Sequence, residues 1–109
     1  MPKPDSLKGT LDLLVLKILS RRPRLHGYAL MAAIQDTSDD VLRVEEGSLY
    51  PALHRMEEAG WVGAEWIAKD GARRVRVYEL TASGKKQLIA EESRWQVVTS
   101  AVNRVLRTV

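Results

Sequence analysis

The 109-residue sequence contains no cysteine, no long apolar run and no internal repeat. Without cysteine the chain forms neither a disulfide nor a thiolate site, which fits a reducing compartment. The most apolar stretch, residues 11–19, is interrupted by Asp12 and Lys17, so we expect no membrane partner. The N-terminus carries lysines but lacks the apolar core of a signal peptide. These absences predict a cytoplasmic protein.

The residue patterns that enzymes use are also missing. His26 and His54 have no cysteine to join them and no H-x-x-x-H spacing, so we expect no metal site. The glutamates at 45–46 and at 57–58 are adjacent within each pair, so their side chains diverge instead of converging on a substrate. Neither a glycine-rich phosphate loop nor a G-x-S-x-G motif occurs. The sequence therefore predicts no enzyme, no catalytic residue and no cofactor.

The composition indicates one small folded domain. Hydrophobic residues make up 45% and charged residues 28% of the chain, which is far from a disordered composition. A domain of this size has a modest core and often completes it by oligomerising. The net charge of +3 is a weak guide, but its distribution is uneven. Residues 36–46 are acidic, whereas residues 69–76 concentrate positive charge; such runs are most often solvated faces.

Hydrophobic spacing predicts three helices in the first sixty residues. The first begins at Leu7, after an arm at 1–6, and ends before Pro23. The second follows the His26-Gly27 turn and ends at the loop 37–40. The third begins near Gly47 or Ser48, with Ser48 as a favourable N-cap and Pro51 in its first turn, and Gly60 ends it.

A β-hairpin and a long helix follow. Residues 62–66 and 74–80 alternate in polarity around an Asp-Gly turn at 69–72. Thr81 caps a helix over roughly 82–107, whose apolar residues follow a seven-residue repeat. The predicted fold is mainly α with a small β-hairpin: a winged helix-turn-helix at 7–80 and a C-terminal dimerisation helix at 81–109. The predicted dimer contacts on that helix are Leu88, Trp95, Val98, Val102 and Val105.

The third helix offers a polar face for recognition. Leu49, Leu53 and Met56 line its buried side. The side chains left for the outward side are Ser48, Tyr50, Pro51, His54 and Arg55. In a helix-turn-helix this face meets base edges while its neighbours hold phosphates. Arg55 suits a guanine edge or a phosphate, and the hydroxyls of Ser48 and Tyr50 suit phosphate or sugar. The alternative is an ordinary amphipathic helix whose polar side faces water.

Four segments resemble a known family. They are LKGTLDLLVLKIL, HGYALMAAI, EEGSLYPALHRMEEAGWVGAEW and RRVRVYELTASGKKQL, which together cover about residues 7–107. They are similar to the PadR family of bacterial transcriptional regulators in its short-tailed form. The resemblance implies a winged helix-turn-helix dimer that binds specific DNA sequences, generally as a repressor relieved in some members by a small molecule. One departure is Val77-Tyr78, where relatives often carry two adjacent aromatic residues.

The resemblance extends the candidate site. It suggests that the Tyr28 hydroxyl touches a DNA phosphate, whereas a core tyrosine is the equal alternative. We expect the hairpin cations Lys69, Arg73 and Arg74 to reach the minor groove or the backbone. Arg76 shares a face with Arg74, so not all three arginines can point at DNA.

The tryptophans have different expected roles. In short PadR-like proteins a tryptophan near Trp95 can line a cavity between subunits and stack on flat ligands, which suggests a small aromatic effector; plain interface packing is the simpler interpretation. Trp61 and Trp66 are interpreted as hairpin core. The predicted function is a homodimeric repressor that binds double-stranded DNA at an inverted repeat. The alternatives are a winged-helix protein-interaction module and a small-molecule-responsive sensor.

Overall fold

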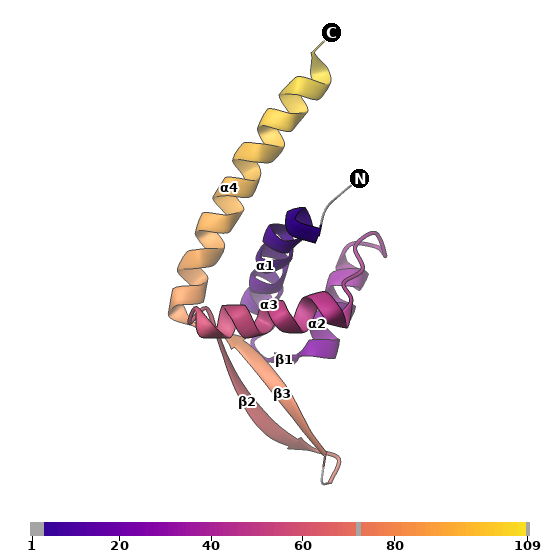
Figure 1. The fold of residues 1–109 in the computed structure, drawn as a ribbon, viewed down its shortest axis with the longest axis vertical. Helices are drawn as coiled ribbons and strands as arrows, with labels where there is room; N and C mark the ends of the chain where they lie inside the picture. The colour runs from indigo at the N-terminus through magenta and orange to yellow at the C-terminus, as the bar shows by residue number, and fades with distance from the viewer. Residues whose placement is uncertain (1–3, 72, 109) are drawn as a thin grey trace.

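The computed structural model describes residues 4–71 and 73–108, with side chains placed from residue 10 onward. Its elements, in chain order, are α1 (Pro4–Arg21), β1 (Leu25–His26), α2 (Gly27–Thr37), α3 (Glu46–Glu58), β2 (Val62–Lys69), β3 (Arg73–Leu80) and α4 (Ala82–Arg107). The molecule is elongated, with extents of 61 × 28 × 22 Å. The β2–β3 hairpin and the free end of α4 project in opposite directions from the body formed by α1, α2 and α3 (Figure 1). This mainly helical fold with a small sheet confirms the predicted winged helix-turn-helix.

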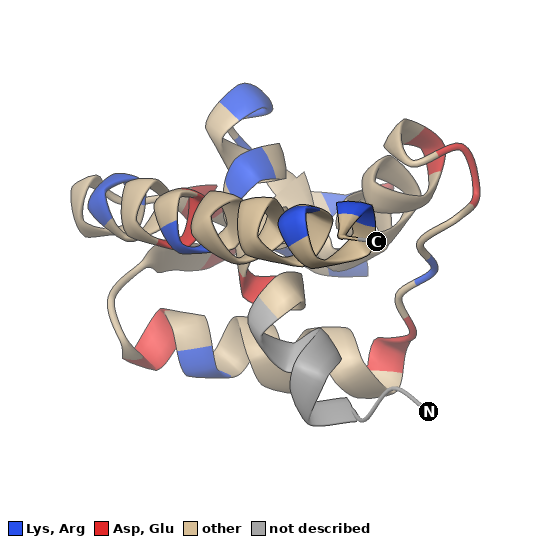
Figure 2. Ribbon diagram, turned by 90° about the horizontal axis from the view of Figure 1, so that it is seen from above, with Lys and Arg blue, Asp and Glu red and all other residues tan. Residues whose placement is uncertain are grey.

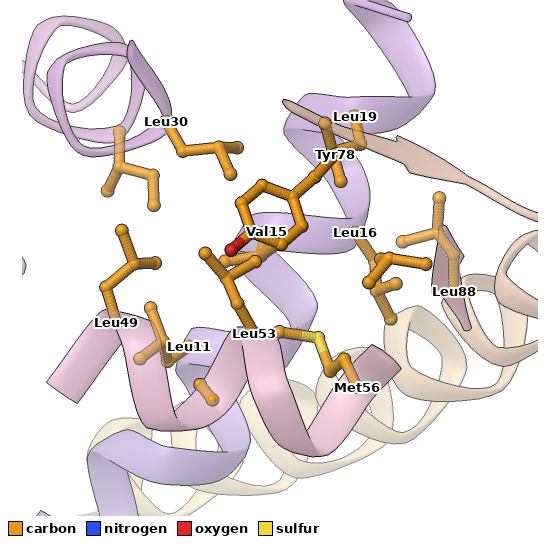
Figure 3. Close-up of a cluster of buried hydrophobic side chains, with 13 residues drawn as sticks. Leu11, Val15, Leu16, Leu19, Leu30, Leu49, Leu53, Met56, Tyr78 and Leu88 are labelled. Carbon is orange, nitrogen blue, oxygen red and sulfur yellow. The ribbon is translucent and has the colours of Figure 1, made fainter. Parts of the chain in front are cut away.

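The core is built from aliphatic side chains of the three short helices. Leu16 of α1, Leu30 of α2 and Leu53 of α3 are fully buried. Tyr78 of β3 and Leu88 of α4 join the same cluster (Figure 3). One hydrophobic core therefore holds α3 together with α1, α2, the sheet and the start of α4.

α1 and α3 begin earlier than their sequence patterns indicate. The expected arm at 1–6 is wrong for residues 4–6, because α1 begins at Pro4; residues 1–3 lie outside the described part. α3 begins at Glu46, so Ser48 lies inside its first turn instead of capping it. Pro51 consequently lies in the second turn, where its missing N–H costs the Gly47 carbonyl its regular helical donor.

The ends of α2 and α3 are fixed by local bonds. His26 caps α2, since its Nδ1 accepts a hydrogen bond from the Ala29 amide at 3.2 Å. Gly60, with φ of 85°, ends α3 as predicted, and the Trp61 amide then donates to the Met56 carbonyl at 2.9 Å. That turn sends the chain directly into β2.

The sheet has three antiparallel strands in the order β1-β3-β2. The predicted hairpin is confirmed, with Val62 opposite Leu80 at its base and Lys69 opposite Arg73 at its tip. Asp70 and Gly71 both have positive φ, as a tight Asp-Gly turn requires. The two-residue strand β1, which pairs with Val77 and Tyr78, was not predicted, so the expectation of a two-stranded sheet is wrong.

α4 matches its predicted bounds but not all of its predicted contacts. Thr81 caps it, because the hydroxyl accepts a hydrogen bond from the Gly84 amide at 2.9 Å. Lys17 of α1 pairs with Glu92 at 3.0 Å. Leu88 was predicted at the dimer interface, but it is only 7% exposed and packs in the core of its own chain, which corrects that assignment. Within the described residues, no helix is both long and apolar enough to cross a membrane.

Candidate DNA-binding surface

The outward face of α3 carries the predicted recognition residues. Ser48, Tyr50, Pro51, His54 and Arg55 are all exposed, while Leu49, Leu53 and Met56 are fully buried. Each residue advances the helix by about 100°, so Gly47, Pro51 and His54 lie at the centre of the outward face. Ser48 and Arg55 flank them on one side and Tyr50 flanks them on the other. The structure thus presents the five predicted side chains on one continuous surface.

Tyr50 connects this face to the start of α2. Its phenol ring lies so close to Gly27 that a Cβ at residue 27 would come within 2.6 Å of the Tyr50 Cζ. Gly27 therefore leaves the space that the Tyr50 ring occupies beside α2. The contact holds the Tyr50 hydroxyl beside the N-terminus of α2, the end of a helix that favours an anion.

Tyr28 lies next to this contact and points into solvent. Its side chain is 69% exposed, which excludes the alternative of a core tyrosine. An exposed aromatic hydroxyl in the first turn of a helix is well placed to donate to a phosphate oxygen. Tyr28 and Tyr50 thus extend the α3 surface onto α2.

Arg55 is held by a partner that the sequence analysis missed. Asp12 of α1 is only 6% exposed, and its two carboxylate oxygens accept hydrogen bonds from Nη1 and Nη2 of Arg55 at 2.8 and 3.0 Å. The hydrogen bonds to Asp12 raise the pKa of Arg55, against the opposing effect of burial. Both terminal nitrogens are therefore engaged within the chain, and the guanidinium stands at the edge of the recognition face. Its role in binding DNA stays a prediction.

Trp66 lies on the hairpin surface, not in its core. It is 54% exposed, so its interpretation as core is wrong. The guanidinium carbons of Arg74 and Arg76 lie 5.5 and 5.2 Å from its ring centroid. Cation–π attraction at these distances orders both arginines along the hairpin. A polarity pattern alone does not distinguish an indole that packs in the core from one that supports exposed arginines.

Of the basic side chains on the hairpin, one is neutralised by an ion pair within the chain and three are free of such a pair in the described structure. Arg76 forms an ion pair with Glu57 of α3 at 2.7 Å. Lys69, Arg73 and Arg74 have no carboxylate within ion-pair distance among the residues that the structure describes. In the described part of the hairpin tip these three cations therefore form no ion pair and outnumber the one carboxylate there, Asp70, whereas Glu57 neutralises the charge nearer α3.

α3 itself is not a basic surface. Glu46, Glu57 and Glu58 outnumber its one arginine, and the acidic loop from α2 lies before its N-terminus (Figure 2). His54 lies 3.4 Å from Glu58, one turn further along the helix. Electrostatic attraction to a polyanion must therefore come from elements beside α3, above all from the hairpin tip.

α4 carries a stripe of exposed apolar side chains beyond the core. Trp95, Val98, Val102 and Val105 are each about half exposed or more. They lie on one side of the helix, since their spacings of three and four residues return to the same face. A soluble helix with such a stripe normally buries it against another chain.

The comparisons with known proteins agree with this arrangement. The sequence profile described as "Transcriptional regulator PadR-like family" matches residues 15–90. A PadR family transcriptional regulator from Eggerthella lenta superposes with a TM-score of 0.80 and 32% identity, over 95% of this chain and 88% of that one. A PadR-like transcriptional regulator from Bacillus cereus gives a TM-score of 0.78 and 28% identity, over 96% and 99%. The transcriptional regulator Rv3488 of Mycobacterium tuberculosis is 43% identical over 54 residues, half of each chain.

The fold, the exposed face of α3 and the basic hairpin tip define a winged-helix regulator. The chain belongs to the PadR-like family of transcriptional regulators. The prediction that it is not an enzyme is confirmed, because the family and the similar structures are regulators.

Proposed function

We propose that this chain acts in the cytoplasm as a homodimeric repressor that binds an inverted-repeat operator in double-stranded DNA. The observation that carries the proposal is the pairing of the exposed α3 face with the uncompensated cations of the hairpin tip. A groove-sized polar helix beside a basic ribbon suits a duplex, because base edges and phosphates are contacted together.

In this proposal each element has a separate task. The Gly47–His54 part of α3 enters the major groove, and Arg55 contributes from the edge of the face where Asp12 holds it. Ser48, Tyr50 and Tyr28 donate hydroxyl hydrogen bonds to the flanking backbone. These contacts fix the position of α3 along the DNA. The groups that contact base edges then distinguish one DNA sequence from another.

The hairpin supplies most of the electrostatic attraction. Lys69, Arg73 and Arg74 contact the phosphates or the minor groove beside the α3 site. Each phosphate contact releases counterions, so the affinity falls steeply as salt rises. Arg76 takes no part in this attraction, because Glu57 already neutralises it.

The apolar stripe of α4 forms the dimer. Trp95, Val98, Val102 and Val105 pack against the same residues of a second chain, which gives a two-fold axis. Two recognition helices related by this axis read half-sites about 34 Å apart, one turn of DNA. Selection of bound sequences from a random duplex pool tests the whole proposal, since it reports binding, symmetry and half-site spacing together. Recovery of no enriched sequence, or of single half-sites alone, would contradict it.

A flat aromatic effector is a second candidate at the same stripe. Trp95 is an exposed indole among aliphatic neighbours, and an indole that meets its symmetry mate can stack on a planar ligand. Such a ligand would change the spacing of the two recognition helices, and operator affinity depends on both fitting at once. The test is titration of planar phenolic and cationic compounds into a chain whose other two tryptophans, Trp61 and Trp66, are replaced by phenylalanine. Unchanged Trp95 fluorescence with every compound would remove this candidate.

A further inference from the structure

Gly47 lies at the centre of the α3 face that we propose meets DNA. It is exposed, and Met56, nine residues further along the helix, is fully buried. Nine residues correspond to about 180° of rotation, so Gly47 points directly away from the core. Pro51 follows one turn later on the same face. At the centre of the outward face, the first two turns of α3 thus present a backbone methylene and a flat ring, with Ser48 and Tyr50 on either side.

Nothing in the described part of the chain requires glycine at position 47. The residue lies in a regular helix, and the glycines with positive φ are Gly60 and Gly71. A Cβ built on Gly47 meets no other atom within 4 Å. Gly27 differs, because a Cβ there would collide with the ring of Tyr50. Alanine is a better helix former than glycine, so position 47 keeps a less favourable residue without an internal reason.

We propose that Gly47 is the point of closest approach between α3 and the floor of the DNA major groove. The inference rests on the proposed operator binding. Without a Cβ at this position the helix axis lies nearer the base edges than any other residue would allow. That depth brings the flanking hydroxyls of Ser48 and Tyr50 to the backbone and the His54 ring to the bases.

A Gly47→Ala variant tests the inference with two readouts, because it lowers the affinity for DNA without lowering the stability of the free protein. The added methyl group lies in open space in the free protein, so the thermal midpoint rises or stays constant. Affinity for a duplex selected from a random pool falls at least tenfold, because the methyl group holds the helix away from the groove. Gly47→Leu, whose side chain also favours a helix, weakens binding further.

Gly63→Ala is the matched control. Gly63 is also open to a Cβ, and it lies opposite Glu79 on the side of the hairpin where Arg24 pairs with both Glu65 and Glu79. That substitution leaves operator affinity within twofold of the wild-type value.

The outcomes separate this inference from the proposed function. Wild-type affinity in a correctly folded Gly47→Ala variant overturns the role of Gly47 and leaves the operator proposal standing. An equal loss of affinity in Gly63→Ala also overturns it. A wild-type chain that binds no selected duplex overturns the proposed function itself, and the inference with it.

Discussion

Asp12 and Arg55 join α1 to α3 through two hydrogen bonds between residues that lie 43 positions apart in the chain. The carboxylate is almost completely buried and the guanidinium is partly exposed. Charge-assisted bonds with this fork geometry are among the strongest polar contacts that a side chain makes. The recognition face is therefore anchored at its edge by an ion pair as well as by its buried leucines.

The first prediction concerns the stability that this pair provides. Arg55→Ala lowers the free energy of unfolding by about 1–3 kcal/mol, because it leaves the buried Asp12 carboxylate without its partner. Asp12→Ala costs less, because water solvates the partly exposed guanidinium that it leaves unpaired. The double variant loses less than the sum, as expected for residues in direct contact. Urea denaturation of the four proteins measures the coupling. Arg24→Ala, which removes the exposed Arg24–Glu65 pair, is the control and costs less than about 1 kcal/mol.

The second prediction concerns the effect of the Asp12–Arg55 pair on operator affinity. The direction of the change in affinity shows whether the pair takes part in DNA binding. Asp12→Asn removes one negative charge, which by itself strengthens binding to a polyanion. If Asp12 positions Arg55 for the operator, affinity falls instead, and fluorescence anisotropy on a labelled duplex measures which effect prevails. An increase would show that Arg55 takes no part in DNA binding through this contact.

A third prediction separates the two arginines that flank Trp66. Arg74→Ala makes the fall of log K with log salt shallower by about 2 in slope, because each of the two subunits loses an available phosphate contact. Arg76→Ala leaves that slope unchanged and lowers stability, since Arg76 is paired with Glu57. Operator titrations at several salt concentrations measure both slopes. Equal slopes for the two variants would contradict the division into available and neutralised cations.

A fourth prediction concerns the α4 stripe. Val102→Glu places a carboxylate in the proposed apolar interface and shifts the chain to a monomer, which sedimentation velocity detects. Val97→Glu introduces the same charge five residues earlier, about 140° around the helix, and leaves the dimer intact. A Val102→Glu variant that remains a dimer would move the interface to another surface.

A fifth prediction concerns alkaline pH. Burial raises the pKa of Tyr78, with smaller effects from Arg76 and Glu57. The unfolded chain loses its phenolic proton first, near pH 10, so the contribution to stability is present below about pH 10 and is lost as pH rises further. Thermal midpoints measured from pH 8 to pH 11 show this fall. Tyr78→Phe makes the fall shallower, whereas Tyr28→Phe, which changes an exposed residue, leaves it unchanged.

Local signals in the sequence predicted the elements that depend on local chemistry. The Asp70-Gly71 pair predicted the hairpin because few residues accept its positive φ. Thr81 predicted the start of α4 because its hydroxyl caps the first turn. The apolar spacing of α3 predicted which side chains face outward. None of these features depends on residues distant in the sequence.

The features that were missed depend on tertiary contacts. The Asp12–Arg55 pair spans two helices, and β1 is too short for a polarity pattern to reveal it. Leu88 fits a seven-residue repeat, but such a repeat does not distinguish burial in the same chain from burial in a partner. Trp66 fits the alternation of a strand that packs on the core. Alternation shows which side chains share a face of the strand, but it does not show whether anything covers that face. To predict any of these features one must know where residues that are distant in the sequence lie in the fold.

The central claim is that the exposed face of α3 and the hairpin tip together bind a DNA duplex. The most direct measurement is the affinity of the purified chain for a selected inverted-repeat duplex between 50 and 200 mM salt. The structure leads us to expect tight binding at low salt that weakens by about a factor of 10³ or more across this range, as for a dimer that makes six or more phosphate contacts. Absent binding, or an affinity that does not change with salt, would contradict the claim and favour a protein partner for this surface.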